Sequence, residues 1–302
     1  MLSLLPSQIY TADAVTRRDL VSKALIDERA YIASWMARTR DLWRYIGLSS
    51  YAVTLQPPTK YEIKYGVDAV VVVKVHGLMK FFAFEAKRPG MGVSRDFDRK
   101  KKGAVWSRFS QQIMRQNALQ KMGWVTGALF LDERPQNSAL FDPLGSTFVP
   151  HADLVTTLPA MSGKAWKAKD VRLLAGSKGI SVMDVLRQLV ICVNGTPTSE
   201  ERAEQALINL LLSSDKLTDL EKEFGVESDT RTAAKVLEEF AIPMAVPMIF
   251  ERSEDGSITK HEKFLTGLLH ATGAYHGAMF VVDEVEPELW SSWEARNRGE
   301  AT

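Results

Sequence analysis

The stretch GVDAVVVVKVHGLMKFFAFEAK, residues 66–87, decides the fold. It holds most of two strand-like runs, 61–75 and 78–86, in which β-branched and aromatic residues favour extended backbone. The runs meet at His76-Gly77, a short polar and flexible pair typical of a tight turn. The sequence therefore predicts a β-hairpin whose two strands pair antiparallel.

The segments on either side of the hairpin enlarge it to an α/β core. Apolar residues recur at steps of three, four or seven over 13–46, which predicts one long helix with a core-facing side. A strand is expected at 51–56, before the hairpin. After it, helix formers at 103–121 end at Gly123, and a further strand is expected at 124–131. The predicted order is helix, three strands, helix, strand.

Two acids and a lysine within this stretch carry the chemistry. Asp68 interrupts an apolar strand, where an acid needs a partner or a chemical role. Glu85 and Lys87 follow at the end of the next strand, and strand alternation puts them on one face. Phe84 and Ala86 then point to the other face. An acid, any residue and a lysine is a weak pattern alone, so its setting on the hairpin is what distinguishes it.

This set of residues suits the hydrolysis of a phosphodiester. Two carboxylates, with water and a substrate phosphate, are a typical way to hold Mg²⁺, so Asp68 and Glu85 are predicted metal ligands. The backbone carbonyl of Ala86 is a further candidate ligand. The ammonium of Lys87 can orient and acidify the attacking water. We therefore expect Mg²⁺ as the cofactor, with Mn²⁺ as a substitute.

Residues 13–131 resemble the PD-(D/E)XK nuclease superfamily, which has a restriction-endonuclease-like fold. The order of elements matches the αβββαβ core of that family, and its metal-binding aspartate, second acid and catalytic lysine fall on Asp68, Glu85 and Lys87. One departure is that the leading Pro-Asp of the family is Val67-Asp68 here. The resemblance implies an α/β fold with this core and a metal-dependent nuclease activity.

The resemblance also implies further site residues. Many members place an acid from the first helix at the metal, and Glu28 is the candidate here, with Asp27 and Glu62 as rivals. Glu28 is equally well explained as an acid on the flank of a helix. Some members use a glutamine from the second helix, which would be Gln112 or Gln116. Glutamines are also ordinary residues of a helix surface.

A structural alternative exists for the central residues, in which Lys87 only neutralises Glu85 and Asp68 pairs with a basic side chain. We favour catalysis because the three residues, the strand pattern, the element order and a basic segment after Lys87 agree. His270 and His276 have no cysteine partners and are expected to be ordinary histidines rather than a zinc site.

The formal net charge is +1, so affinity for a nucleic acid must come from a local patch. The best candidate follows Lys87, where basic residues outnumber acids. The side chains expected to contact the phosphate backbone are Arg88, Lys100, Lys101, Lys102 and Arg108. The alternative is that this segment is a solvated loop.

A stretch rich in proline and glycine after residue 131 predicts a domain boundary near residue 160. Residues 1–160 are expected to form the nuclease-like domain, and residues 161–302 a second, mainly helical accessory domain. Within it, 199–260 is compatible with a winged helix or with a plain helical bundle. Its many glutamates count against a large DNA-facing surface. The domain is also a candidate for binding a protein partner or for forming a homodimer.

The sequence thus predicts a cytoplasmic, metal-dependent endonuclease or exonuclease. No apolar run reaches the roughly 18 residues of a membrane span, the start lacks a secretory signal pattern, and Cys192 is the sole cysteine. DNA is the expected substrate because most of the resembling family cuts DNA. Two other classes stay open: a nuclease fold kept as a binding or assembly module, and an adaptor that recruits a DNA-processing partner.

Overall fold

The computed structural model describes residues 2–25, 27–47, 49–54, 65–88, 98–131, 145–212 and 260–300. None of the helices in these ranges has the length and apolarity needed to cross a membrane. The elements, in chain order, are η1 (Leu2–Leu4), α1 (Leu5–Val21), α2 (Glu28–Tyr45), β1 (Ser50–Thr54), β2 (Ala69–Val75), β3 (Leu78–Lys87), α3 (Arg108–Lys121), β4 (Val125–Phe130), β5 (Thr147–Pro150), α4 (His151–Thr157), η2 (Leu158–Met161), α5 (Ala168–Lys178), β6 (Ile180–Ser181), α6 (Val182–Val190), β7 (Thr198–Ser199), α7 (Glu200–Leu212), α10 (Lys260–Thr272), β8 (His276–Val282) and α11 (Pro287–Asn297).

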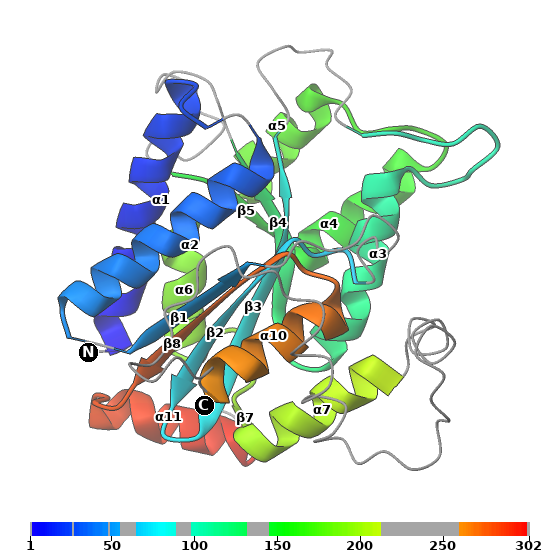
Figure 1. The fold of residues 1–302 in the computed structure, drawn as a ribbon. Helices are drawn as coiled ribbons and strands as arrows, with labels where there is room; N and C mark the ends of the chain where they lie inside the picture. Colours follow the sequence, from blue (N-terminus) through cyan, green and yellow to red (C-terminus); the bar gives the residue numbers. More distant parts are fainter. Residues whose placement is uncertain are drawn as a thin grey trace, which may run out of the picture.

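Strands β2 and β3 form the predicted hairpin in the middle of the sheet (Figure 1). Val75 pairs directly with Leu78, so the turn consists of His76 and Gly77 alone. Both turn residues have positive φ, 44° and 83°, as a two-residue type I′ turn requires. The turn therefore fixes the register of the two strands along their whole length.

The described strands make one mixed sheet in the order β1-β8-β2-β3-β4-β5-β6, with β7 also pairing with β3. β8 runs parallel to β2 and antiparallel to β1, and β4 runs parallel to β3. The predicted α/β class is confirmed. Along the chain, α2, β1, β2, β3, α3 and β4 follow the predicted order, but β8 separates β1 from β2. Because β8 comes late in the chain, the sheet runs across the boundary predicted near residue 160.

Helices cover both faces of this sheet (Figure 1). On one face α1, α2, α6 and α11 share a core that includes Trp35, Phe84 and Trp293. On the other face α7 and α10 pack through Leu207 and Leu265. Helices α3, α4 and α5 form a third cluster with β4 and β5. Ala86 and Phe84 point into the first core, as strand alternation predicted, so Glu85 and Lys87 project from the opposite face of β3.

The single long helix predicted over 13–46 is wrong, because the structure has two helices there. Lys23 has a φ of 64°, which is incompatible with a continuing helix. Asp27 then begins a new helix, since its side chain accepts a hydrogen bond of 2.7 Å from the Ala30 backbone N–H. The break matters because it places Glu28 in the first turn of α2.

The described part of the loop-rich segment expected after residue 131 begins at residue 145 and contains regular elements. Strand β5 pairs antiparallel with β4, and α4 begins at His151 directly after it. Further along the chain, α5 and α6 flank β6, and most of the described part of 161–302 is helical. Residues 213–259 lie outside the described ranges, and they make up most of 199–260, the region predicted to be a winged helix or a helical bundle.

Gly66 brings the segment before β2 against helix α3. Its φ is 66°, and a Cβ added there would lie 2.3 Å from the backbone oxygen of Gln112. The Gln116 side chain donates a hydrogen bond of 2.7 Å to the Gly66 carbonyl. This close approach holds α3 against the segment that leads to Asp68.

We predict that Gly66→Ala costs far more stability than Gly77→Ala. Both positions have positive φ, which costs an L-residue roughly 1–2 kcal/mol. A Cβ at Gly77 meets nothing within 4 Å, whereas one at Gly66 overlaps the α3 backbone. Overpacking of this kind adds about 1–3 kcal/mol. Urea denaturation of the two variants measures the difference, and equal losses would contradict the close approach.

Candidate active site

Glu85 lies at the centre of a pocket at the end of β3, and its residue is 1% exposed. One carboxylate oxygen, Oε1, forms an ion pair with Lys87 and accepts a hydrogen bond of 2.6 Å from the Gln112 side chain. The other oxygen, Oε2, is buried and has no hydrogen-bond partner among the described residues. A buried carboxylate oxygen of this kind is costly unless a cation or a donor meets it.

Asp68 lies opposite Glu85 across the hairpin, because Ala69 pairs with Phe84 in the antiparallel register. Its Oδ2 accepts a hydrogen bond of 2.8 Å from the Ala86 backbone N–H. Burial, followed by the negative charge of Glu85, raises the pKa of Asp68 well above its ordinary value. The charge of Glu85 thus opposes the ionisation of Asp68.

Lys87 projects from the same strand face as Glu85, as predicted, and its side chain is 15% exposed. Its ammonium lies 5.6 Å from the centre of the Phe109 ring. Burial lowers the pKa of Lys87, but the charges of Glu85, Asp68 and Glu28 outweigh it, so the pKa is raised overall. Lys87 is therefore cationic at every physiological pH.

Glu28 reaches the pocket from the first turn of α2. Its carboxylate accepts a hydrogen bond of 2.5 Å from the Arg88 backbone N–H. Burial raises the pKa of Glu28, against the lowering effect of Lys87. Of the three acids considered for this position, Glu28 is the one that lines the pocket, while Asp27 caps α2 and Glu62 lies outside the described residues.

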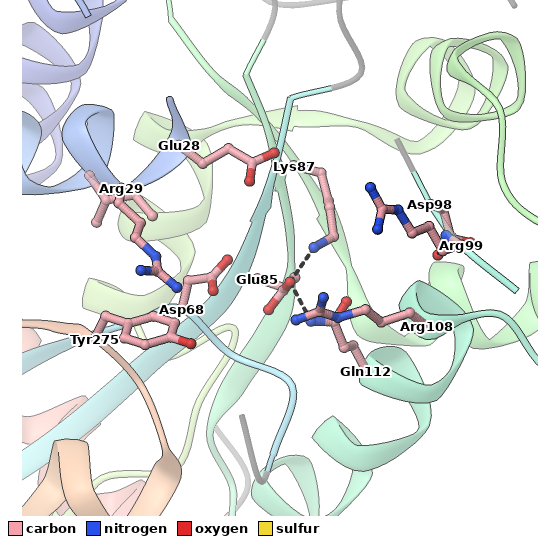
Figure 2. A pocket seen from close by; sticks show the side chains of 11 residues that line it. Glu28, Arg29, Asp68, Glu85, Lys87, Asp98, Arg99, Arg108, Gln112 and Tyr275 are labelled. Carbon is pink, nitrogen blue, oxygen red and sulfur yellow. Dashed lines mark hydrogen bonds and ion pairs between the residues drawn. The ribbon is translucent and has the colours of Figure 1, made fainter. Parts of the chain in front are cut away.

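The pocket has a volume of about 380 Å³. Acids form its floor, and three exposed arginines stand around it, from α2, from the segment before α3 and from α3 itself (Figure 2). The lining residues are Glu28, Arg29, Ile32, Asp68, Glu85, Lys87, Asp98, Arg99, Arg108, Gln112 and Tyr275. An anionic group entering from solvent meets the arginines first and the carboxylates last.

The other predicted site residues lie at different places. Gln112 contacts Glu85, but Gln116 donates to the backbone carbonyls of Gly66 and Gly127 at 2.7 and 3.1 Å and does not line the pocket. Its role in the structure is to hold α3 against the sheet. Ala86 contributes its backbone N–H to Asp68, and its side chain is in the core.

The predicted basic segment is divided in the structure. Arg108 lines the pocket, whereas the three lysines do not. Lys100 donates a hydrogen bond of 2.8 Å to the Ala104 carbonyl, and Lys101 and Lys102 are exposed. Arg88 meets the site through its backbone N–H. Residues 89–97 lie outside the described ranges.

Five lining residues were not among the predicted site residues: Arg29, Ile32, Asp98, Arg99 and Tyr275. Arg29 follows Glu28 directly, so it could have been found once a helix start was recognised there. Asp98 accepts backbone hydrogen bonds from Arg99, at 2.8 Å, and from Phe109, at 2.9 Å, and so shapes the start of α3. Tyr275 had no local signal, since its place depends on β8.

The carboxylates of the pocket provide some, but not all, of the ligands that a divalent cation needs. Among the residues that the structure describes, no group of three or more His, Cys, Asp or Glu side chains forms a metal site. Mg²⁺, however, is commonly held by one or two carboxylates while waters and substrate phosphate complete its shell. The unpartnered Oε2 of Glu85 and the opposed carboxylate of Asp68 fit that smaller donor set.

Comparison with known proteins gives no relative. No protein-family model, no curated protein and no solved structure matches the chain. The geometry of the site is therefore the basis for the assignment of function.

We predict that Asp68→Asn raises the melting temperature of the metal-free protein at pH 8. A carboxyl whose pKa is raised by folding favours the folded state while protonated, and this contribution is lost as the pH rises through the folded pKa. Asparagine keeps the oxygen that accepts from Ala86 and removes the charge. The gain should shrink as the pH falls toward the unfolded pKa of about 3.9.

The matched control is Asp41→Asn. Asp41 is exposed on α2 beside Arg40, so its loss should change stability by less than about 0.5 kcal/mol. Thermal unfolding in the presence of a chelator, from pH 4 to pH 8, measures both variants. A lower melting temperature for Asp68→Asn at pH 8 would show that ionised Asp68 stabilises the fold.

Proposed function

We propose that this protein is a metal-dependent nuclease with a restriction-endonuclease-like core, and that it hydrolyses phosphodiester bonds, with DNA as the first substrate to test. The observation that carries the proposal is the meeting of Asp68, Glu85 and Lys87 in one pocket. Two acids and a lysine come from neighbouring strands of one hairpin, and basic side chains surround them. This is the arrangement that a metal-assisted attack on a phosphate needs.

The order of elements supports the proposed core. The helix α2, the strands β1, β2 and β3, the helix α3 and the strand β4 follow one another along the chain, and β4 lies parallel to β3. Both helices begin at the pocket, since Glu28 is the first residue of α2 and Arg108 the first of α3. Strand β8 is an addition to this core.

In the proposed mechanism Asp68 and Glu85 would hold Mg²⁺, and Glu28, which lines the same pocket, is a third acid that could take part. Mg²⁺ supplies charge stabilisation at the phosphate and acidifies water. The buried Oε2 of Glu85 has no partner among the described residues, and a bound cation would lower the pKa of Asp68, which burial and Glu85 raise. Mn²⁺ suits the same oxygen ligands.

Lys87 and Gln112 act on either side of Glu85. Gln112 donates to Oε1 and so fixes the plane of the carboxylate. Lys87 bonds to the same oxygen, and its ammonium has further donors that can hold the attacking water in line with the phosphate. A lysine kept cationic by three nearby acids stabilises the negative charge that grows at the phosphate.

A second candidate function is a binding or assembly module that keeps the nuclease fold. The observation that favours it is the ion pair between Lys87 and Glu85, in which Gln112 shares the same oxygen. Such a cluster is also a stable structural unit without any metal. The two candidates differ in what Lys87 and the two acids contribute to cleavage.

The first prediction for this site concerns the acids. Asp68→Asn and Glu85→Gln should each abolish cleavage of DNA in Mg²⁺ or Mn²⁺ and should remove the rise in melting temperature that these ions cause. A ligand that binds only the folded state raises its stability, so the thermal shift reports metal binding without turnover. A nuclease assay and thermal unfolding with and without Mg²⁺ measure the two effects.

The matched control is Glu288→Gln, an exposed acid on α11. It should cut and respond to Mg²⁺ as the wild type does. If either site variant cuts at the wild-type rate, that residue is not a metal ligand in the reaction. A wild type that gives no cleavage and no thermal shift favours the binding module.

The second prediction concerns Lys87→Arg, which keeps the charge. The planar guanidinium pairs side-on with a carboxylate, so it should clamp Glu85 and leave the water without its donor. Cleavage under single-turnover conditions should fall by about 100-fold or more, the scale of one lost electrostatic stabiliser, while DNA binding persists.

The control for this variant is Lys74→Arg. Lys74 lies on β2 of the same hairpin but does not line the pocket, and it forms an ion pair of 2.8 Å with Glu200 of α7. It tests whether arginine is tolerated in a lysine–glutamate pair that has no catalytic task. Near-normal cleavage by both variants would move Lys87 from catalysis to structure.

A further inference from the structure

The arginines of the pocket stand on two walls, with the acids between them. Arg29 and Tyr275 form one wall, and Arg99 and Arg108 form the other (Figure 2). In the same view Asp68 and Glu85 lie between Arg29 on one side and Arg99 on the other, and the Arg108 side chain points inward toward Glu85. A phosphate chain that crosses the floor therefore meets a guanidinium before the acids and another after them.

Arg29 is connected to Asp68 through Tyr275. The Arg29 guanidinium carbon lies 4.3 Å from the centre of the Tyr275 ring, within the range of a cation–π contact. The Tyr275 backbone N–H donates a hydrogen bond of 2.9 Å to the Asp68 carbonyl. An exposed arginine is thus held in place by a residue bonded to the metal-ligand candidate itself.

On the opposite wall, backbone hydrogen bonds hold Arg99 and Arg108 in place. The Arg108 backbone N–H donates a hydrogen bond of 2.8 Å to the Arg99 carbonyl, so the two residues lie side by side. Asp98 accepts from the backbones of Arg99, Phe109 and Trp166, the last at 3.1 Å, and fixes this corner to the protein. Both walls therefore present guanidinium groups from a fixed backbone.

The size of the pocket limits what can enter. A volume of about 380 Å³ lies near the lower end of the range for ligand pockets, roughly 300–1,000 Å³. A DNA duplex is wider than its major groove, which is roughly 12 Å across. Glu85 is 1% exposed at the bottom, so a stiff duplex would meet both walls before its phosphate reached the acids. A single strand can turn its backbone inward.

The lining also offers little for reading bases. Tyr275 is the one aromatic ring among the described lining residues, and it is 5% exposed and covered by Arg29. A base therefore has no open ring on which to stack, which is the usual contact of proteins that hold single strands through their bases. The contacts available are to phosphates.

We propose that this pocket takes a single nucleic-acid strand, with the scissile phosphodiester at Asp68 and Glu85, a neighbouring phosphate on Arg29, and the phosphate on the other side on Arg99 and Arg108. The inference rests on the proposed nuclease function for the first of these positions. The positions proposed for the two outer phosphates are inferred from the arrangement of the arginines alone. Substrates are single strands or frayed ends, and cutting is independent of base sequence.

The test measures binding and cleavage on matched substrates: a single strand of DNA, the RNA strand of the same sequence, the blunt duplex and a closed circular duplex. Binding is measured in Ca²⁺ and cleavage in Mg²⁺. We expect the single strand to bind at least tenfold more tightly than the blunt duplex, and to be cut at least tenfold faster than either duplex. The DNA and RNA strands show which sugar is accepted.

The variant that tests the outer position is Arg29→Gln, with Arg187→Gln as the control. Arg187 is an exposed arginine on α6, away from the pocket, that pairs with Asp184. Arg29→Gln should weaken binding of the single strand by about tenfold and lower its salt slope by about 0.7, the value for one phosphate contact. Arg29→Lys should recover part of the salt slope, and Arg187→Gln should leave both quantities unchanged.

Equal binding of single strand and blunt duplex overturns the proposal, and so does an unchanged salt slope in Arg29→Gln. These binding results do not depend on turnover. In another outcome the protein cuts none of the substrates and still prefers the single strand and responds to Arg29→Gln. That outcome supports the two-walled phosphate site and contradicts the nuclease function. Cleavage of circular duplex as fast as the single strand contradicts the strand preference and leaves the nuclease function intact.

Discussion

The antiparallel register of β2 and β3 is the constraint on which the site depends. The two-residue turn at His76 and Gly77 sets that register, and it places Asp68 opposite Glu85. A slip of one residue would turn the side chains of β3 to the other face and send Glu85 into the apolar core. Phe84 and Ala86, packed in that core, make such a slip costly. The packing of Phe84 and Ala86 on one face of β3 thus determines that Glu85 and Lys87 project from the other.

Around this hairpin, two helix starts complete the pocket. Glu28 and Arg29 stand in the first turn of α2, which exists because the chain breaks after Lys23 and restarts at Asp27. On the other side, α3 is held to the hairpin by the close approach of Gly66 and by the hydrogen bonds of Gln116. Two helices that begin at one site direct their positive ends toward it, which favours bound anions.

What could be predicted from the sequence was local. The hairpin, the shared face of Glu85 and Lys87 and the strand β4 follow from alternation and turn chemistry over short distances. The insertion of β8 between β1 and β2 could not be seen, because its partners precede it by some 200 residues and no local pattern marks them. Tyr275, which precedes β8, was missed for the same reason. The helix break after Lys23 escaped because apolar spacing continued across it.

The charge balance of the pocket bears on how the proposed metal and phosphate would bind together. The four lining acids, Glu28, Asp68, Glu85 and Asp98, equal in number the four lining bases, Arg29, Lys87, Arg99 and Arg108. A phosphate that entered alone would meet the carboxyl groups of Asp68 and Glu28, whose pKa values burial already raises. A divalent cation offsets that repulsion, and the phosphate in turn supplies oxygens that the cation lacks. If the proposed function holds, each ligand would strengthen the binding of the other by the same factor, since such coupling is reciprocal.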